Sequence, residues 1–235
     1  MRINKYIAEC GVTSRRNADI LIKDGKVKLN GKTVSSPGVD VNEENDSVSV
    51  EGVKISLPSN YTYIVFNKPK GCVTTAKDDK GRKTIFDFIN INKRLFPVGR
   101  LDYDSEGMLI LTNDGDLSFR LTHPSNEIPK TYSVKIEGEI LESDIAKLRG
   151  TVSLPGGGVS HHARIRKIEE KNGFTKLEVT IYEGKNRQIR KMFESVGKNV
   201  VFLKRTAIGD FRLGGISRGS WRYLSEDEIY YLKNI

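Results

Sequence analysis

Histidine, cysteine and tryptophan are scarce in this chain of 235 residues, which holds three His, two Cys and one Trp. Cys10 and Cys72 do not form a CxxC pair, and two of the His are adjacent while the third is distant. No set of these residues therefore has the spacing of converging metal ligands. The glycines at 156–158 are not followed by Lys-Ser or Lys-Thr, which excludes a P-loop, and no dinucleotide fingerprint is present. We expect no metal and no cofactor, so that any chemistry comes from side chains alone.

Long hydrophobic runs are also missing. No stretch is long and apolar enough to span a membrane, and the N-terminal Met-Arg-Ile-Asn-Lys-Tyr lacks the apolar core of a signal peptide. With 37% apolar and 29% charged residues, the composition is that of a globular protein. The length suits one large domain, or a small and a medium one. We expect a cytoplasmic monomer with reduced thiols and no membrane partner.

Positive charge is in excess and is unevenly distributed. The net charge is +9. Residues 1–32 hold eight Lys or Arg against three Asp or Glu, and residues 185–222 hold ten against two, so the rest of the chain carries a net −4. Two basic blocks on a slightly acidic body predict a polyanionic partner that is contacted at two places.

One carboxylate, Asp102, occupies a position that suits catalysis. It follows Gly-Arg-Leu and precedes the apolar residues 108–111, which predict a buried strand. Asn113-Asp114-Gly115 then predicts a tight turn. An acid on a glycine-bounded loop that enters a buried strand is rigidly mounted.

Several other roles for this carboxylate are open from the residues alone. Asp102, Asp104, Glu106 and Gly107 resemble the start of a calcium-binding EF-hand loop, but position twelve of that loop would be Asn113 instead of Glu. Asp102 and Glu106 could be an acid/base pair for glycoside hydrolysis, although a single Trp argues against a sugar groove. Asp102 could also cap a turn and pair with Arg100.

The N-terminal segment predicts two short helices followed by a small sheet. Apolar residues at helical spacing mark a helix over 2–10, and Thr13-Ser14 offers an N-cap for a second one. Residues 27–34 alternate around an Asn30-Gly31 hairpin turn. With basic residues near the helix ends, this module resembles the RNA-binding domain of the ribosomal protein S4 type. The resemblance implies that the second helix presents Arg15 and Arg16 to RNA phosphates.

A second domain is predicted after a linker at 58–62. A strand at 63–66 leads into Asn67-Lys68-Pro69-Lys70-Gly71, where Pro and Gly force an irregular turn. Strands dominate the remainder, with helices expected at 143–149 and 187–196. The predicted fold class is α+β: a helix-hairpin RNA-binding domain at 1–57, and a mostly antiparallel mixed-sheet catalytic domain at 63–235.

Several segments of the second domain match one family in order. They are the Asn-Lys-Pro-x-Gly turn, the Gly-Arg-Leu-Asp loop that ends at Asp102, Lys130-Thr131-Tyr132, the segment 183–190, and the strands around 203–209 and 219–224. Together they resemble the rRNA pseudouridine synthases of the RsuA/RluB/RluE/RluF family over nearly the whole chain. Met108 stands where Leu is usual, and no departure removes a functional group.

The resemblance implies three catalytic residues, Asp102, Tyr132 and Arg190. Pseudouridine forms when uracil leaves the ribose C1′, turns and reattaches through carbon. Asp102 would act as nucleophile at C1′ or at uracil C6, or as a base at the ribose. Arg190 would pair with Asp102 and hold it ionised, and Tyr132 would stack on the extracted base and transfer a proton.

The partner expected from the resemblance is ribosomal RNA or a ribosome-assembly intermediate. The sequence motifs Phe96-Pro-Val-Gly and Lys185-Asn186-Arg187-Gln188 favour large-subunit (23S) RNA as the substrate, with small-subunit (16S) RNA as the alternative. A non-catalytic RNA-binding assembly factor, and an RNA nuclease or glycosidase using Asp102 and Glu106, are the rival functions. The expected RNA-binding residues are Arg2, Lys5, Arg15, Arg16, Lys26, Lys28, Arg100, Lys185, Arg187, Lys204 and Arg205.

Overall fold

The computed structural model describes all residues from 1 to 235, which form two compact units. The first unit contains Met1–Thr62 together with Ile91–Leu95 and Asn113–Gly115, and the second contains the rest of the chain. Both cysteines are free thiols, as predicted. None of the helices combines the length and the apolar character needed to cross a membrane.

The first unit has the predicted helices and hairpin. Helix α1 spans Ile3–Glu9 and α2 spans Arg15–Lys23, and the Ser14 hydroxyl caps α2 by accepting a hydrogen bond from the Asn17 amide. Asn30 and Gly31 both have positive φ, the conformation of a type I′ hairpin turn. The sheet order is β2-β1-β3-β4, with β1 at Val27–Leu29, β2 at Lys32–Thr33, β3 at Val48–Val50 and β4 at Val53–Ile55.

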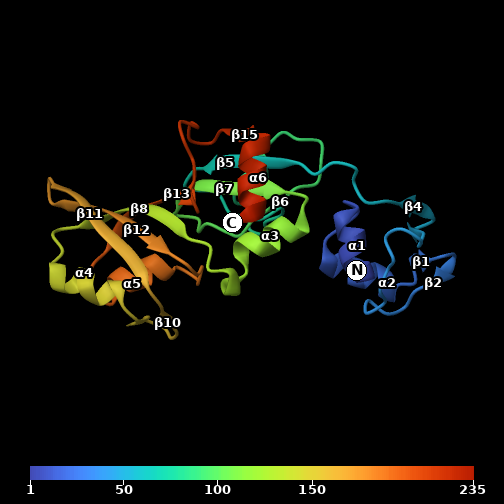
Figure 1. The fold of residues 1–235 in the computed structure, drawn as a ribbon, viewed down its shortest axis with the longest axis horizontal. Helices are drawn as coiled ribbons and strands as arrows, with labels where there is room; N and C mark the ends of the chain where they lie inside the picture. Colours follow the sequence, from blue (N-terminus) through green and yellow to red (C-terminus); the bar gives the residue numbers. More distant parts are fainter. The chain divides into compact units, whose positions relative to one another are not determined.

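A nine-stranded sheet forms the centre of the second unit (Figure 1). Its order is β11 (Ala163–Lys171), β12 (Phe174–Ile181), β8 (Lys130–Glu137), β13 (Val200–Ile208), β7 (Glu106–Thr112), β5 (Tyr63–Lys68) and β15 (Trp221–Tyr223); in addition β14 (Phe211–Arg212) pairs with β13, and β6 (Phe96–Pro97) pairs with β7. All these pairs are antiparallel except β13 with β7. The predicted mostly antiparallel mixed sheet is thus confirmed.

The parallel contact between β7 and β13 is short. Only Lys204↔Glu106 and Arg205↔Gly107 are paired across it. Gly107 has a φ of +106°, and a Cβ at this position would lie 2.2 Å from the Arg205 carbonyl oxygen. Glycine is therefore required where these two strands meet. This junction, defined by the two residue pairs, joins the two antiparallel halves of the sheet.

Helices α3 (Gly115–Thr122) and α6 (Glu226–Asn234) pack against the β5 and β7 half. Leu117, Leu121 and Leu232 from these helices share a core with Val65 and Ile110. The turn predicted at 113–115 does not lead into a hairpin: Gly115 is already the first residue of α3. A helix is favoured here because it places Leu117 and Leu121 on one face and buries both against the sheet.

The remaining elements belong to the other half of the second unit or connect its strands. The helices predicted at 143–149 and 187–196 are present as α4 (Glu142–Arg149) and α5 (Gln188–Glu194). A small two-stranded sheet forms from β9 (Val152–Ser153) and β10 (Val159–Ser160). Two short 3-10 turns cover Ile85–Asp87 and Pro124–Asn126.

Candidate active site

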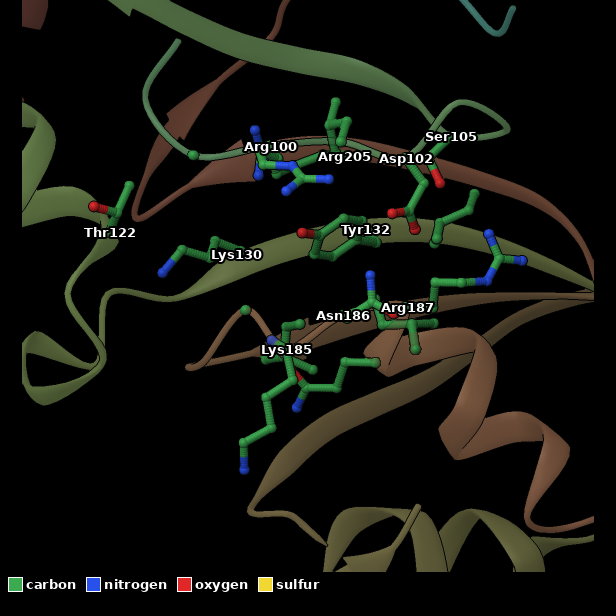
Figure 2. Close-up of a pocket in the computed structure, with 17 residues that line it drawn as sticks. Arg100, Asp102, Ser105, Thr122, Lys130, Tyr132, Lys185, Asn186, Arg187 and Arg205 are labelled. Atoms are coloured by element: carbon green, nitrogen blue, oxygen red, sulfur yellow. Dashed lines mark hydrogen bonds between the residues drawn. The ribbon is translucent and has the colours of Figure 1, made fainter. Parts of the chain in front are cut away.

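A cavity of about 330 Å³ opens in the second unit beside the junction of β7 and β13. Its walls come from the loop before β7, the start of β8, the segment before α5, and the middle of β13 (Figure 2). The residues that matter most for its chemistry are Asp102, Lys130, Tyr132, Arg187 and Arg205. The volume is at the lower end of the range for small-molecule sites.

Strand periodicity places two of these side chains. Side chains of a strand alternate between its faces, so Lys130 and Tyr132 point to the same side of β8. Tyr132 is the direct partner of Arg205 on the neighbouring strand β13. Both are buried, with 8% and 4% of their surface exposed, and both line the cavity.

The loop that carries Asp102 is fixed from behind by a buried cation. The Lys68 ammonium donates hydrogen bonds to the carbonyl oxygens of Pro69 (3.1 Å), Asp102 (3.0 Å) and Ser105 (3.0 Å). Burial lowers the pKa of Lys68, and nearby acidic groups oppose that effect. The three carbonyls satisfy a charge that would otherwise be costly to bury. Sequence reasoning assigned no role to Lys68, whose function depends on carbonyls that only the folded loop brings together.

The Asp102 side chain itself is half-buried and lines the cavity (Figure 2). Its loop is held on the other side by Thr74, whose hydroxyl donates to the Leu101 carbonyl (2.7 Å) and accepts from the Leu101 amide (3.2 Å). The backbone on both sides of the carboxylate is therefore tied down. Asp102 makes no ion pair with Arg100, which lines the same cavity and is exposed.

The expected pairing of Arg190 with Asp102 is wrong for this structure. The Arg190 guanidinium forms an ion pair with Asp104 (3.2 Å) and also donates to the carbonyls of Asp104 (3.1 Å) and Val200 (2.6 Å). Arg187 binds the same Asp104 carboxylate through both of its terminal nitrogens (3.1 and 3.2 Å). A turn at residues 103–104 brings Asp104 to these arginines. The Ser105 amide closes this turn by donating a hydrogen bond to the Asp102 carbonyl.

This cluster of one carboxylate and two arginines adjoins the cavity. Burial would raise the pKa of Asp104, but the hydrogen bonds of Arg187 and the charge of Arg190 outweigh it, and the pKa lies below its ordinary value. Asp102 contributes to the electrostatic surroundings of both arginines without a direct bond. Arg190 does not line the cavity, whereas Arg187 does.

Two buried cations form part of the cavity wall. Arg205 donates from Nε to the Met108 carbonyl (2.8 Å), and its Nη2 is buried without a hydrogen-bond partner. Lys130 donates to the Ile128 carbonyl (2.9 Å), and burial together with the Arg205 charge lowers its pKa to about 8. Arg205 was expected to contact RNA, and the structure places it inside the cavity. Lys130 was not predicted, although its position two residues before Tyr132 was a usable signal.

Other expected RNA-binding residues of the second unit divide between the two faces of the sheet. Lys185 lines the cavity, pairs with Glu183 (2.7 Å) and donates to the Val159 carbonyl. Lys204 lies next to Arg205 in β13 and therefore points to the opposite face, away from the cavity.

The expected RNA-binding residues of the first unit differ in their partners. Arg15, Arg16 and Lys28 are exposed, and no carboxylate pairs with them. The three others form ion pairs: Arg2 with Asp40, Lys5 with Glu9, and Lys26 with Glu51.

Glu106 does not form a two-carboxylate site with Asp102. It is almost fully buried in β7 and pairs with Arg218 (3.1 Å). Neither a calcium loop nor a glycosidase pair fits a carboxylate that is already engaged in this way.

Comparison with known proteins identifies relatives along the whole chain. Residues 62–195 match a family model described as RNA pseudouridylate synthase, and residues 1–48 match the S4 domain. The Bacillus subtilis protein named ribosomal large subunit pseudouridine synthase B is 41% identical over 99% of this chain and 95% of its own length. An uncharacterized RNA pseudouridine synthase of Aquifex aeolicus is 43% identical over 99% and 93%. A pseudouridylate synthase crystal structure matches with a TM-score of 0.71 at 32% identity over 99% of both chains.

Proposed function

The chain belongs to the RNA pseudouridylate synthases and carries an S4 domain, and from this we propose that it converts a specific uridine of ribosomal RNA to pseudouridine, with Asp102 as the catalytic carboxylate. One observation carries the proposal: a half-buried carboxylate on a fixed loop shares a cavity with a tyrosine ring and two buried cations. Substrate and product have the same composition, so the reaction consumes no oxidant, reductant or water.

Each group in the cavity has a role that its chemistry allows. The bond between C1′ and uracil N1 breaks with its electron pair on the uracil, the uracil turns, C5 bonds to C1′, and C5 loses a proton while N1 gains one. The Asp102 carboxylate acts as nucleophile at C1′ or C6, or as a base at the ribose. The Tyr132 ring offers a flat face for the base and a hydroxyl for proton transfer.

The cations serve the charged and polar parts of the nucleotide. Arg205 lines the cavity, and its buried guanidinium places a positive charge next to a uracil carbonyl or a phosphate oxygen bound there. Lys130 adds a second positive charge nearby. Arg187 and Arg190 hold Asp104 and so fix the turn that follows Asp102. Extracting the uridine from a stack costs a few kcal/mol, which contacts to the flanking backbone can offset.

We further propose large-subunit RNA as the substrate. The support is the Bacillus subtilis relative, whose name assigns it to the large ribosomal subunit and which matches this chain from end to end. Mapping pseudouridines in 23S and 16S rRNA from cells with and without the protein tests this assignment. A site that disappears from 16S rRNA alone would reverse it.

The role of Asp102 is tested by Asp102→Asn, which removes the anionic oxygen without changing the size of the side chain. We expect isomerisation to fall by several orders of magnitude while RNA affinity and Tm stay nearly unchanged. Tritium release from 5-tritiated uridine in rRNA, together with filter binding, measures both. Asp210→Asn is the matched control, because Asp210 is exposed and lines neither this cavity nor the adjacent pocket that Asp102 also borders. Activity of the Asp102 variant within about tenfold of wild type would overturn the assignment.

A further inference from the structure

The face of the catalytic sheet opposite the cavity carries a second concentration of positive charge. Strand alternation sends Ser133 and Lys135 of β8 to this side, while Tyr132 and Val134 point to the other. A shallow groove of about 680 Å³ runs over β8, β11, β12 and β13 here. Five cations and one carboxylate supply its charged lining: Lys135, Arg166, Lys176, Lys204, Arg212 and Glu178. We refer to it as the basic groove.

Most of this charge is unbalanced. Arg166 is the only one of the five that pairs with a carboxylate, Glu178, at 3.1 Å. The side chains of Lys176, Lys204 and Arg212 form no hydrogen bond or ion pair within the chain, and the Lys135 side chain has only the Phe174 ring as a partner, at 4.1 Å from its centroid. An exposed lysine is ordinary by itself, but a concave surface with this excess of one sign focuses the potential on an anionic ligand.

The arrangement of the lysines opposes folding. Lys135 and Lys176 are direct partners across β8 and β12, and like charges directly opposite one another destabilise an antiparallel pair. Local rules of this kind are broken in natural proteins mainly at functional sites. A bound anion would remove the repulsion, which is what a binding site for a polyanion requires.

An aromatic side chain adds a second feature suited to RNA. Phe202 is partly exposed in the basic groove, and Lys70 lies 5.3 Å from the centroid of its ring. Base stacking on such a ring, flanked by cations, is the common means of holding nucleic acid without reading its sequence. An acidic protein surface would use the cations but would leave this ring without a base to stack on it.

We propose that the basic groove binds the backbone of a segment of the substrate RNA distant from the target uridine. The inference rests on the proposed function, since it takes ribosomal RNA as the substrate. The cavity and the groove lie on opposite faces of one sheet, so a single short strand does not fill both. A folded RNA that wraps around the outer strands β11 and β12 reaches the two faces together.

The test neutralises two of the unpaired cations in the full-length protein, Lys176→Gln with Arg212→Gln. Neither residue lines the cavity. Lys83→Gln with Lys171→Gln is the control, because both lysines are exposed, form no ion pair and lie outside cavity and groove. Affinity is measured against salt for two probes: unmodified 23S rRNA transcribed in vitro, and a short oligouridylate that reaches only one face. Isomerisation of the transcript by wild type and variant at saturating RNA is followed in parallel.

For the transcript, we expect the slope of log K against log salt to become shallower by about 1.4–1.8 in the double variant, the value for two lost phosphate contacts. Binding of the oligouridylate, the rate at saturating RNA and the control variant should match wild type. Tm should be equal or higher, because the Lys135–Lys176 repulsion is relieved.

An unchanged slope would overturn the proposal. The proposal would also be overturned if the double variant bound and modified naked rRNA like wild type but lost activity on large-subunit precursors that contain ribosomal proteins. That result would assign the groove to a ribosomal protein. A wild-type protein that binds the transcript but isomerises no uridine would contradict the proposed function and leave the groove result standing.

Discussion

The role of Arg190 depends on the backbone turn that follows Asp102. Asp102 and Asp104 are two residues apart, and the turn between them directs only Asp104 toward α5. Arg190 therefore acts on the Asp102 loop through Asp104 and through the carbonyls of Asp104 and Val200. Its expected effect is on the position of the loop.

Replacing Arg190 by Met should lower kcat by about a hundredfold, the order seen when a positioned donor is lost from an active site. Arg190→Lys should recover only part of the rate, since the ammonium restores the charge without the planar set of donors that reaches three oxygens. Single-turnover tritium release measures both. Arg222→Met is the control, because Arg222 makes a similar pair with Glu228 elsewhere on the second unit. Full activity of Arg190→Met would show that Arg187 alone holds the loop.

Lys130 predicts a dependence on pH. Its pKa of about 8 in the folded protein means that the ammonium in the cavity is lost as the pH rises through 8. We expect kcat/KM, which reports groups of the free enzyme, to fall over that range. Lys130→Arg should remove this decline because the guanidinium stays charged. Lys130→Met should be weakly active with no decline. A wild-type profile that stays flat from pH 7 to about 9 would remove Lys130 from substrate binding.

The same lysine gives a stability signature with a defined sign. Burial lowers its pKa from 10.5 to about 8, so the folded protein releases the proton more readily than the unfolded chain does. Below pH 8 the buried charge reduces stability, and stability recovers as the pH rises from about 8 toward 10.5. Urea unfolding of wild type compared with Lys130→Met should show this rise in the wild type only.

At the scale of elements, the junction of β7 and β13 connects the two halves of the sheet next to the cavity. Arg205 and Gly107 pair there, and the backbone of Arg205 leaves no room for a Cβ at position 107. The position of the Arg205 side chain in the cavity thus depends on a glycine in another strand.

Gly107→Ala tests this dependence. The added methyl group forces the strands apart, and we expect a loss of about 1–3 kcal/mol in the free energy of unfolding, with a clear drop in activity. Gly157→Ala is the matched control, because Gly157 has a similar φ of +97° with nothing within 4 Å of its added Cβ. The Gly157 variant is therefore destabilised only by placing alanine at a positive φ. Equal destabilisation of the two variants in urea titrations would show that crowding at the junction is unimportant.

Periodicity and turn chemistry were enough to predict most elements from the sequence. They located both helices and the hairpin of the first unit, the strands β5 and β7, and the helices α4 and α5. Helix α3 was missed because Asn113-Asp114-Gly115 also suits a hairpin turn. The pairing of Arg190 and the cavity position of Arg205 depend on loop geometry and strand register, which are set by contacts between residues far apart in the sequence.

At the scale of the whole molecule, the basic character of the first unit is expected to add affinity without adding chemistry. Arg15→Ala with Arg16→Ala should weaken rRNA binding and reduce the salt slope by about 1.4–1.8, because both arginines are exposed and unpaired. The rate at saturating RNA should not change. Arg2→Ala with Lys26→Ala removes the same charge from residues that already pair with carboxylates, and should have a smaller effect. Equal slopes in filter binding for wild type and the Arg15/Arg16 variant would assign the first unit to another partner.

From the packing alone, we expect evolutionary divergence to be constrained most strongly at the two residue pairs that join β7 and β13. They fix the strand that follows Asp102 and the strand that carries Arg205. The outermost strands β11 and β15 take no part in that contact. Their length, loops and surface charge can drift while the glycine at 107 is retained. A lineage can therefore acquire a new RNA target by altering the rim of the sheet, and inherit the reacting groups unchanged.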